Sequence, residues 1–144
     1  MTVDPQTLTL TRILNAGREE VFAAWTTAES MRRWMCPDGV TEVLVQLDVR
    51  VGGTFRIDML HGGEWLAHTG TYREIDPPKR LVFTWVSQAT RHRETLVRVE
   101  LRALGDQTEL TLTHTLLPDA EAVEMHTRGW SQILERLASH IYSR

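Results

Sequence analysis

The sequence predicts an α+β fold in which a bent antiparallel sheet carries two short helices and one long C-terminal helix. Residues 119–142 repeat apolar side chains at helical spacing, which predicts an amphipathic helix. Most of the segment 41–115 alternates apolar and polar residues with a period of two, which is typical of strands. A helix of this length would extend about 35 Å, which is enough to lie across a sheet of ten-residue strands. The expected domain therefore has two layers, a sheet and a helix, with one core between them.

The N-terminal part of the chain begins with a strand and continues with two helices. Residues 8–15 alternate leucine and arginine against threonine and isoleucine, which indicates a strand. Residues 18–25 and 28–35 then place aromatic residues and methionine at helical spacing, which indicates two short helices. The Cys-Pro-Asp-Gly sequence at 36–39 contains turn residues and should end the second helix.

The central part predicts six strands that follow one another as a meander. They are expected at residues 41–51, 54–60, 64–75, 80–86, 95–102 and 109–115. The breaks between strands carry turn residues such as the Gly62-Gly63 pair and Pro77-Pro78. Alternation in the strand at 64–75 is weak and does not show which of its faces points inward. Gly70 inside this strand predicts a bulge or a strong bend.

The C-terminal helix should cover the sheet with one apolar stripe. Asp119 follows a proline and is a plausible N-cap, and Glu121 suits the positive end of the helix dipole. The stripe also includes His126, one turn before Trp130. Its residues are Val123, His126, Trp130, Ile133, Leu134, Leu137, Ala138 and Ile141.

Length and composition fit a single cytoplasmic domain spanning residues 1–144. The net charge of −3 and pI of about 6.1 give no reason to expect a nucleic-acid or anionic membrane surface. The only cysteine, Cys36, excludes an internal disulfide framework. Residues 1–6 lack the features of a signal peptide, and no stretch approaches the roughly 20 apolar residues of a membrane helix.

Motifs with a direct chemical meaning are missing from the sequence. The six histidines show no metal-ligand spacing, and Cys36 has no histidine near it in sequence. The phosphate-binding glycine patterns and the nucleophile elbow of hydrolases are also missing. We therefore predict no catalytic residue, no metal and no cofactor.

Several segments together resemble a known superfamily. They are residues 18–25, 31–34, 51–57, 70–85, 108–114 and the Gly129-Trp130 pair. In their sequence and order they resemble the START-like, or SRPBCC, helix-grip superfamily. The closest branch is the one related to the C-terminal domain of the heat shock protein 90 ATPase activator. This resemblance covers nearly the whole chain and implies the helix-grip fold, which hosts lipid carriers, polyketide cyclases, toxin-sequestering proteins and co-chaperone domains.

The resemblance also implies a cavity between the sheet and the long helix. Apolar faces of several predicted elements would meet there, and His114 and His126 would be its few polar groups. A fully packed core with two hydrogen-bonded histidines is the alternative for the same residues. The expected lining residues are Trp34, Phe55, Ile57, Met59, Trp85, Val97, Leu112, His114, His126 and Trp130.

Three functions are compatible with these features. The first is non-catalytic binding of a small apolar or aromatic molecule in the cavity. The second is a co-chaperone-like interaction domain that binds a chaperone or another protein through its surface. The third is a polyketide cyclase-like or hydrolase-like enzyme with His114 or His126 as general acid or base. We rank ligand binding first and expect a monomer or a homodimer.

Overall fold

A computed structural model describes residues 6–142 and contains one sheet, three α-helices and a short 3-10 helix. The first strand and the two short helices precede a meander of six strands, and the long helix comes last. In chain order the elements are β1 (Leu8–Leu14), α1 (Arg18–Thr26), α2 (Ala28–Trp34), β2 (Val40–Leu47), β3 (Thr54–His61), β4 (Glu64–Asp76), β5 (Arg80–Trp85), η1 (Gln88–Thr90), β6 (Thr95–Leu104), β7 (Gln107–Thr115) and α3 (Ala120–Tyr142).

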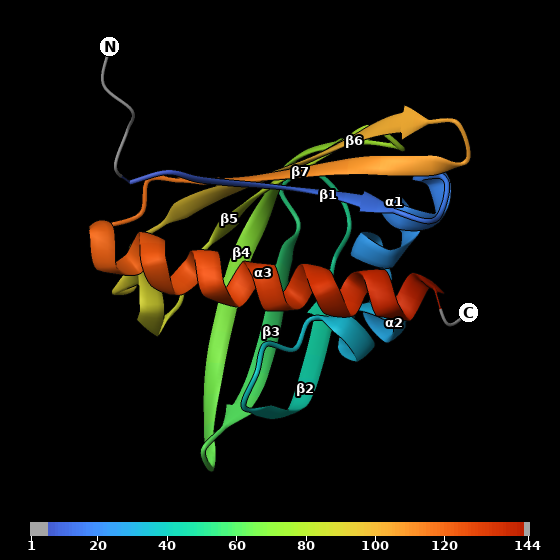
Figure 1. Cartoon of the computed structure of the whole chain (residues 1–144). Coiled ribbons are helices and arrows are strands. Elements are labelled where there is room, and N and C mark those ends of the chain that lie inside the picture. Colours follow the sequence, from blue (N-terminus) through green and yellow to red (C-terminus); the bar gives the residue numbers. More distant parts are fainter. Residues whose placement is uncertain (1–5, 143–144) are drawn as a thin grey trace.

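The sheet is antiparallel throughout, with the strand order β1-β7-β6-β5-β4-β3-β2. It curls strongly, so that β2 and β3 turn away from β1 and β7 (Figure 1). The turn is made within β4, whose first half pairs with β3 and whose second half pairs with β5. The pairing with β5 shifts register between Tyr72 and Glu74, just after Gly70. A side chain at Gly70 would collide with the Thr84 carbonyl oxygen and the Phe55 ring, so only glycine fits this bend.

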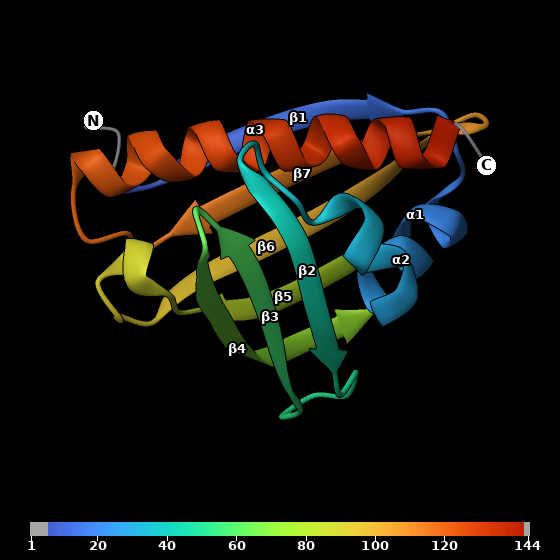
Figure 2. The same ribbon diagram turned by 90° about the horizontal axis from the view of Figure 1, so that it is seen from below.

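The long helix α3 lies across the concave face of the curled sheet. Seen from below, β2 and β3 cross the direction of α3, whereas β1 and β7 run nearly along it (Figure 2). Asp119 caps the helix, because its carboxylate accepts a hydrogen bond from the Ala122 backbone N–H at 2.9 Å. The predicted apolar stripe faces the sheet, and Trp130, Ile133, Leu134, Leu137 and Ile141 are buried. The expected helix-grip arrangement is therefore confirmed.

The two short helices close one end of the curled sheet. Their aromatic residues Trp25 and Trp34 are both fully buried, with ring centroids 4.7 Å apart in an edge-to-face contact. Trp25 also lies 6.3 Å from Trp130 of α3, measured between ring centroids. The helices thus join the core that α3 forms with the sheet.

One predicted strand ends earlier than its pattern suggests. The alternation of residues 41–51 continues through Val49 and Val51, but β2 ends at Leu47. The strand stops because Leu47 pairs with Phe55 near the start of β3, so the residues between them must form the connection. Val51 is 63% exposed in this turn.

The sequence predicted neither a signal peptide nor a membrane-spanning helix. Residues 1–5, which belong to the segment without signal-peptide features, lie outside the described residues. No helix in the described part of the chain combines the length and apolar character that crossing a bilayer requires.

Candidate functional site

The space inside the curled sheet next to α1 and α2 is almost completely filled. A cavity of only about 10 Å³ remains among the side chains of α1, α2 and strands β2 to β5, with Trp25, Phe55, Ile57 and Trp85 in its wall. A single water needs roughly this much space, so no organic molecule fits here. No residue of α3 lines this space.

A larger pocket of about 130 Å³ lies under the N-terminal half of α3. Its walls come from strands β3, β4 and β5 on one side and from α3 on the other, with η1 and the segment before β2 at its ends. Most of the lining is apolar or aromatic, which is common for small-molecule sites. The lining residues are Pro37, Met59, His68, Trp85, Ala89, Met125, His126, Gly129, Trp130 and Ile133.

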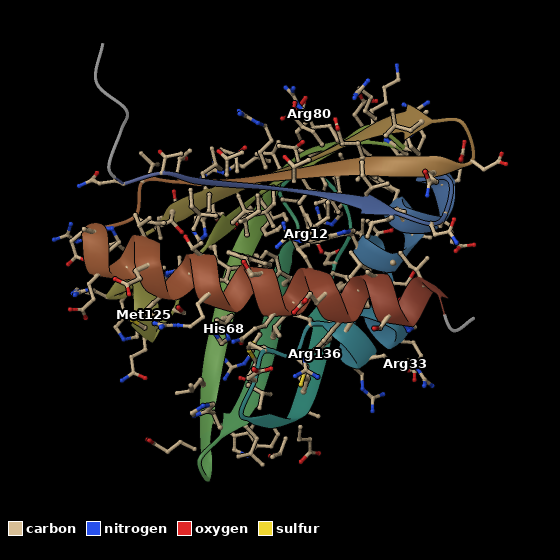
Figure 3. All side chains as sticks on the ribbon, viewed as in Figure 1. Arg12, Arg33, His68, Arg80, Met125 and Arg136 are labelled. Carbon is tan, nitrogen blue, oxygen red and sulfur yellow. The ribbon has the colours of Figure 1, made fainter. Side chains whose placement is uncertain are left out.

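This pocket adjoins a second hollow of about 350 Å³. The two share His68, Ala89 and Met125, so these residues lie between the two spaces. His68 on β4 and Met125 on α3 lie beneath the N-terminal half of the helix (Figure 3). At the rim, Arg91 forms ion pairs with Asp119 at 3.0 Å and with Glu121 at 3.8 Å. These ion pairs connect the loop after η1 to the start of α3.

His126 lines the pocket and is held by its own helix. Its Nδ1 lies 2.7 Å from the Ala122 carbonyl oxygen, four residues earlier. A carbonyl only accepts hydrogen bonds, so Nδ1 carries the proton and Nε2 of the neutral ring keeps a lone pair. Burial lowers the pKa of His126, although the Ala122 carbonyl partly opposes this effect. The ring is therefore neutral at pH 7.

His68 on β4 has the same protonation pattern. Its Nδ1 donates to the carbonyl oxygen of Ile57, its cross-strand partner, at 3.2 Å, so Nε2 is unprotonated in the neutral ring. Its ring centroid lies 5.2 Å from that of Trp85. Burial has the largest effect and lowers the pKa of His68. The backbones of Ile57 and Leu66 and the Asp58 carboxylate favour the charged ring, and His126 disfavours it. Two neutral imidazoles therefore contribute to one pocket.

His114 lies deeper in the core, and both of its ring nitrogens have partners. Its Nδ1 accepts from the Trp130 indole N–H at 3.0 Å, and its Nε2 lies 2.7 Å from Thr95 Oγ1. The Thr95 hydroxyl also lies 2.6 Å from the Trp85 carbonyl and donates to it, so the His114 Nε2–H is the donor to Thr95. Burial, with a smaller effect from nearby His126, lowers the pKa of His114 to about 3.

The ten predicted lining residues are all buried, but they separate into three groups. Met59, Trp85, His126 and Trp130 line the 130 Å³ pocket. Phe55 and Ile57, together with Trp85, line the small inner cavity. The remaining residues line neither of these two spaces and belong to the surrounding core: Trp34, Val97, Leu112 and His114.

Several residues of the pocket were not predicted from the sequence. His68 was missed because the weak alternation in β4 did not identify its inward face. Met125 directly precedes His126 on the helix, and Gly129 directly precedes Trp130. Both His126 and Trp130 were predicted to line the cavity, and this adjacency is the feature of the sequence that could have pointed to Met125 and Gly129. Pro37 and Ala89 lie outside the regular elements or in a single 3-10 turn, and periodicity gives no information there.

The pocket offers shape, apolar surface and imidazole nitrogens. Among the described residues, neither His114 nor His126 contacts a carboxylate, the partner that commonly orients a catalytic imidazole. In the same residues no group of three or more histidine, cysteine, aspartate or glutamate side chains is arranged to hold a metal ion. The arrangement is suited to enclosing a small ring and forming hydrogen bonds with it.

Comparisons with known proteins agree with this architecture. The sequence profile of the family described as "Activator of Hsp90 ATPase homolog 1-like protein" matches residues 15–141. No curated protein matches the chain significantly.

Solved structures share the fold over almost the whole chain. A protein from Chromobacterium violaceum is 27% identical, with a TM-score of 0.85 over 96% of this chain and 98% of that chain. CalU16 from Micromonospora echinospora is 26% identical, with a TM-score of 0.71 over 94% of this chain and 75% of that chain. A Rhodobacter sphaeroides protein at 20% identity has a TM-score of 0.83 over 97% and 94% of the two chains, which is a likeness of fold alone.

Proposed function

The chain belongs to the Activator of Hsp90 ATPase homolog 1-like family, and from this premise we propose that it binds a small apolar or aromatic molecule without catalysis. The binding site is the 130 Å³ pocket between the sheet and the N-terminal half of α3. Four of the ten lining residues expected from the sequence line this pocket: Met59, Trp85, His126 and Trp130.

The observation that carries this proposal is the open space beside Gly129. Gly129 lies in the interior of α3, where glycine costs roughly 0.5–1 kcal/mol relative to alanine. A Cβ atom added at this position would meet no other atom within 4 Å. The glycine is therefore not required by close contact with a neighbouring element. Its effect in the fold is to leave the pocket wall open between His126 and Trp130.

The volume of the pocket indicates the size of the ligand. An apolar protein cavity of about 150 Å³ holds a benzene molecule, so about 130 Å³ suits one six-membered ring. Trp85 and Trp130 form flat walls, with ring centroids 5.1 Å apart. Met59 and Met125 add flexible thioether side chains, which adapt to ligands of different shape. Substituents of the ligand ring would extend into the neighbouring hollow of about 350 Å³, which Arg91 lines.

Toluene is a suitable first probe, since it presents a ring without hydrogen-bonding groups. Its binding should shift the indole ¹H–¹⁵N resonances of Trp85 and Trp130 in NMR titrations, with Trp25 and Trp34 less affected. Gly129→Leu should abolish these shifts, because the new side chain occupies the pocket. Gly129→Ala should weaken binding only in part and raise the free energy of unfolding by about 0.5–1 kcal/mol.

Arg128→Leu is the matched control, because it places the same side chain on the exposed face of α3 next to Gly129. Toluene should bind to this variant as it does to the unchanged protein. If toluene binds equally well to Gly129→Leu, or binds to none of the proteins, the pocket is not a ligand site.

A second candidate is a protein-binding surface, favoured by apolar side chains on the outer face of β2 to β4. Trp65 and Leu44 are each 46% exposed there, and Trp65 pairs with Leu60 across the strands. Large exposed apolar groups of this kind often mark interaction sites. Trp65→Ser with Leu44→Ser should reduce binding of a chaperone partner in pull-down experiments and leave toluene binding unchanged. The reverse result would support the pocket instead.

A further inference from the structure

We propose that the pocket selects an aromatic ligand that carries a hydroxyl group, as phenol does, over the same ring with a methyl or carbonyl group. This inference rests on the proposed function and names the chemistry of its ligand. It follows from the hydrogen-bonding state of each polar side chain in the pocket wall, taken in turn.

The first acceptor is Nε2 of His126. Since Nδ1–H is used by the Ala122 carbonyl, the only hydrogen-bonding capacity left in the neutral ring is the lone pair on Nε2. In the described part of the chain this nitrogen has no hydrogen-bond partner. Its ring is 8% exposed and lines the pocket, so a donor group of a bound ligand can reach it in place of water.

The second acceptor is Nε2 of His68, on the opposite wall. Among the described residues the full hydrogen bond of this ring is from Nδ1–H to the Ile57 carbonyl, so the neutral ring keeps its lone pair on Nε2. The Leu66 backbone also interacts with the ring and slightly favours its charged form. The two histidines come from β4 and α3, so a ligand between them can reach either one. Both pKa values are lowered, mainly by burial, which keeps the rings neutral and able to accept at pH 7.

The two tryptophans of the wall differ in what they offer. The Trp130 indole N–H already donates to His114 and is not available to a ligand. The Trp85 indole N–H has no partner among the described residues, so it can act as a donor. A hydroxyl group both donates and accepts, so it can satisfy a histidine and this indole together. A carbonyl only accepts, and a methyl group does neither.

The inference predicts an order of affinity for molecules of nearly equal size. At pH 7.5 phenol should bind about ten-fold more tightly than toluene, the effect of roughly one net hydrogen bond. Benzaldehyde should bind more weakly than phenol, because it cannot donate to either imidazole. Titration calorimetry or indole NMR shifts give the three dissociation constants.

His126→Leu and His68→Leu test the two acceptors separately. Each change should reduce the preference for phenol over toluene, and the double variant should abolish it. Toluene affinity should change little in all of them. His61→Leu is the control, because His61 lies exposed at the end of β3 and does not line the pocket. Its preference for phenol should equal that of the unchanged protein.

A measurement on the unchanged protein covers the case that these variants fold poorly. The ¹⁵N resonance of an unprotonated Nε2 moves when the nitrogen accepts a hydrogen bond. Phenol should shift the Nε2 resonance of His126 or His68, and toluene should not. No shift with bound phenol would show that the histidines do not recognise the hydroxyl group.

The outcomes separate this inference from the proposed function. Equal binding of phenol and toluene would refute the hydroxyl preference and leave the pocket as an apolar binding site. Benzaldehyde binding as tightly as phenol would assign recognition to the Trp85 donor and also refute it. If none of the three molecules binds, the proposed function itself fails.

Discussion

Trp130 of α3 donates its indole N–H to Nδ1 of His114 on β7, across 3.0 Å in the buried core. From His114 the hydrogen bonds continue to Thr95 on β6 and then to the Trp85 carbonyl at the end of β5. The long helix is thus joined to three neighbouring strands by directional bonds as well as by apolar contact. The same bonds fix the orientation of the Trp130 ring, which forms one wall of the pocket.

Trp130→Phe should therefore be more harmful than its small loss of volume suggests. Phenylalanine keeps an aromatic ring but leaves Nδ1 of His114 without a donor, which costs about 1–3 kcal/mol for a buried group. Urea unfolding would measure the change in the free energy of unfolding. The double variant Trp130→Phe with His114→Phe should lose less free energy of unfolding than the two single variants added together. Each single change breaks the same hydrogen bond, so the sum of the two counts that loss twice.

Leu137→Ala should destabilise the fold through the apolar stripe of α3. Leu137 is fully buried, and large-to-small changes at such sites cost about 2–5 kcal/mol. Glu135→Ala on the exposed side of the same helix turn is the control and should change stability by less than about 0.5 kcal/mol. Equal stability of both variants in chemical denaturation would mean that the stripe does not hold α3 to the sheet.

Acid should destabilise the protein between pH 6.5 and about 3 because of His114. In the unfolded chain this histidine titrates near its ordinary pKa of 6.5, whereas in the fold its pKa is about 3. Over this window the unfolded state binds more protons, so the free energy of unfolding falls as the pH is lowered. His68 and His126 act in the same direction, because their pKa values are also lowered. Each group contributes at most about 1.4 kcal/mol per pH unit.

Urea unfolding at pH 7, 6 and 5 measures this slope. His114→Gln should give a shallower slope than the unchanged protein, whatever its stability at pH 7. A slope for His114→Gln as steep as that of the unchanged protein would contradict the burial of a neutral His114.

Gly70→Ala should be strongly destabilising at the bend of β4. The added methyl group would overlap the Thr84 carbonyl oxygen and the Phe55 ring, neither of which can move without disturbing the sheet. We expect a loss of about 3 kcal/mol or more, at the upper end for overfilled sites. Gly17→Ala, where a Cβ would meet only the Glu19 side chain at an ordinary 3.6 Å, should stay within about 1 kcal/mol. Thermal unfolding of the two variants would test the difference.

The elements of the fold could be predicted because each has a local cause. The periods of two and 3.6 in the apolar residues identify the strands and helices, and Asp119, Gly62 and Gly63 mark a cap and a turn, all of which the structure confirms. The end of β2 could not be predicted in this way. It depends on where β3 begins to pair, and the alternating pattern of the sequence simply runs past that point.

The candidate site depended much more on tertiary structure. Sequence periodicity assigns a residue to the inner face, and all ten predicted lining residues are indeed buried. It does not show which inner-face residues contact each other and which border an empty space, because that depends on how β4 bends and on where α3 crosses the sheet. His114 and His126 share the interior, yet only His126 lines the pocket, while His114 is enclosed by Trp130 and Thr95.

By itself the sequence determined the order and type of the elements and the apolar stripe of α3, since these follow from residue spacing along the chain. Only the tertiary structure decided where the interior stays open and which nitrogens face that space. Both depend on contacts between residues distant in sequence, such as the Ile57 carbonyl that takes the Nδ1 proton of His68. An imidazole has two possible donors, and only its neighbours in the fold determine which nitrogen remains an acceptor.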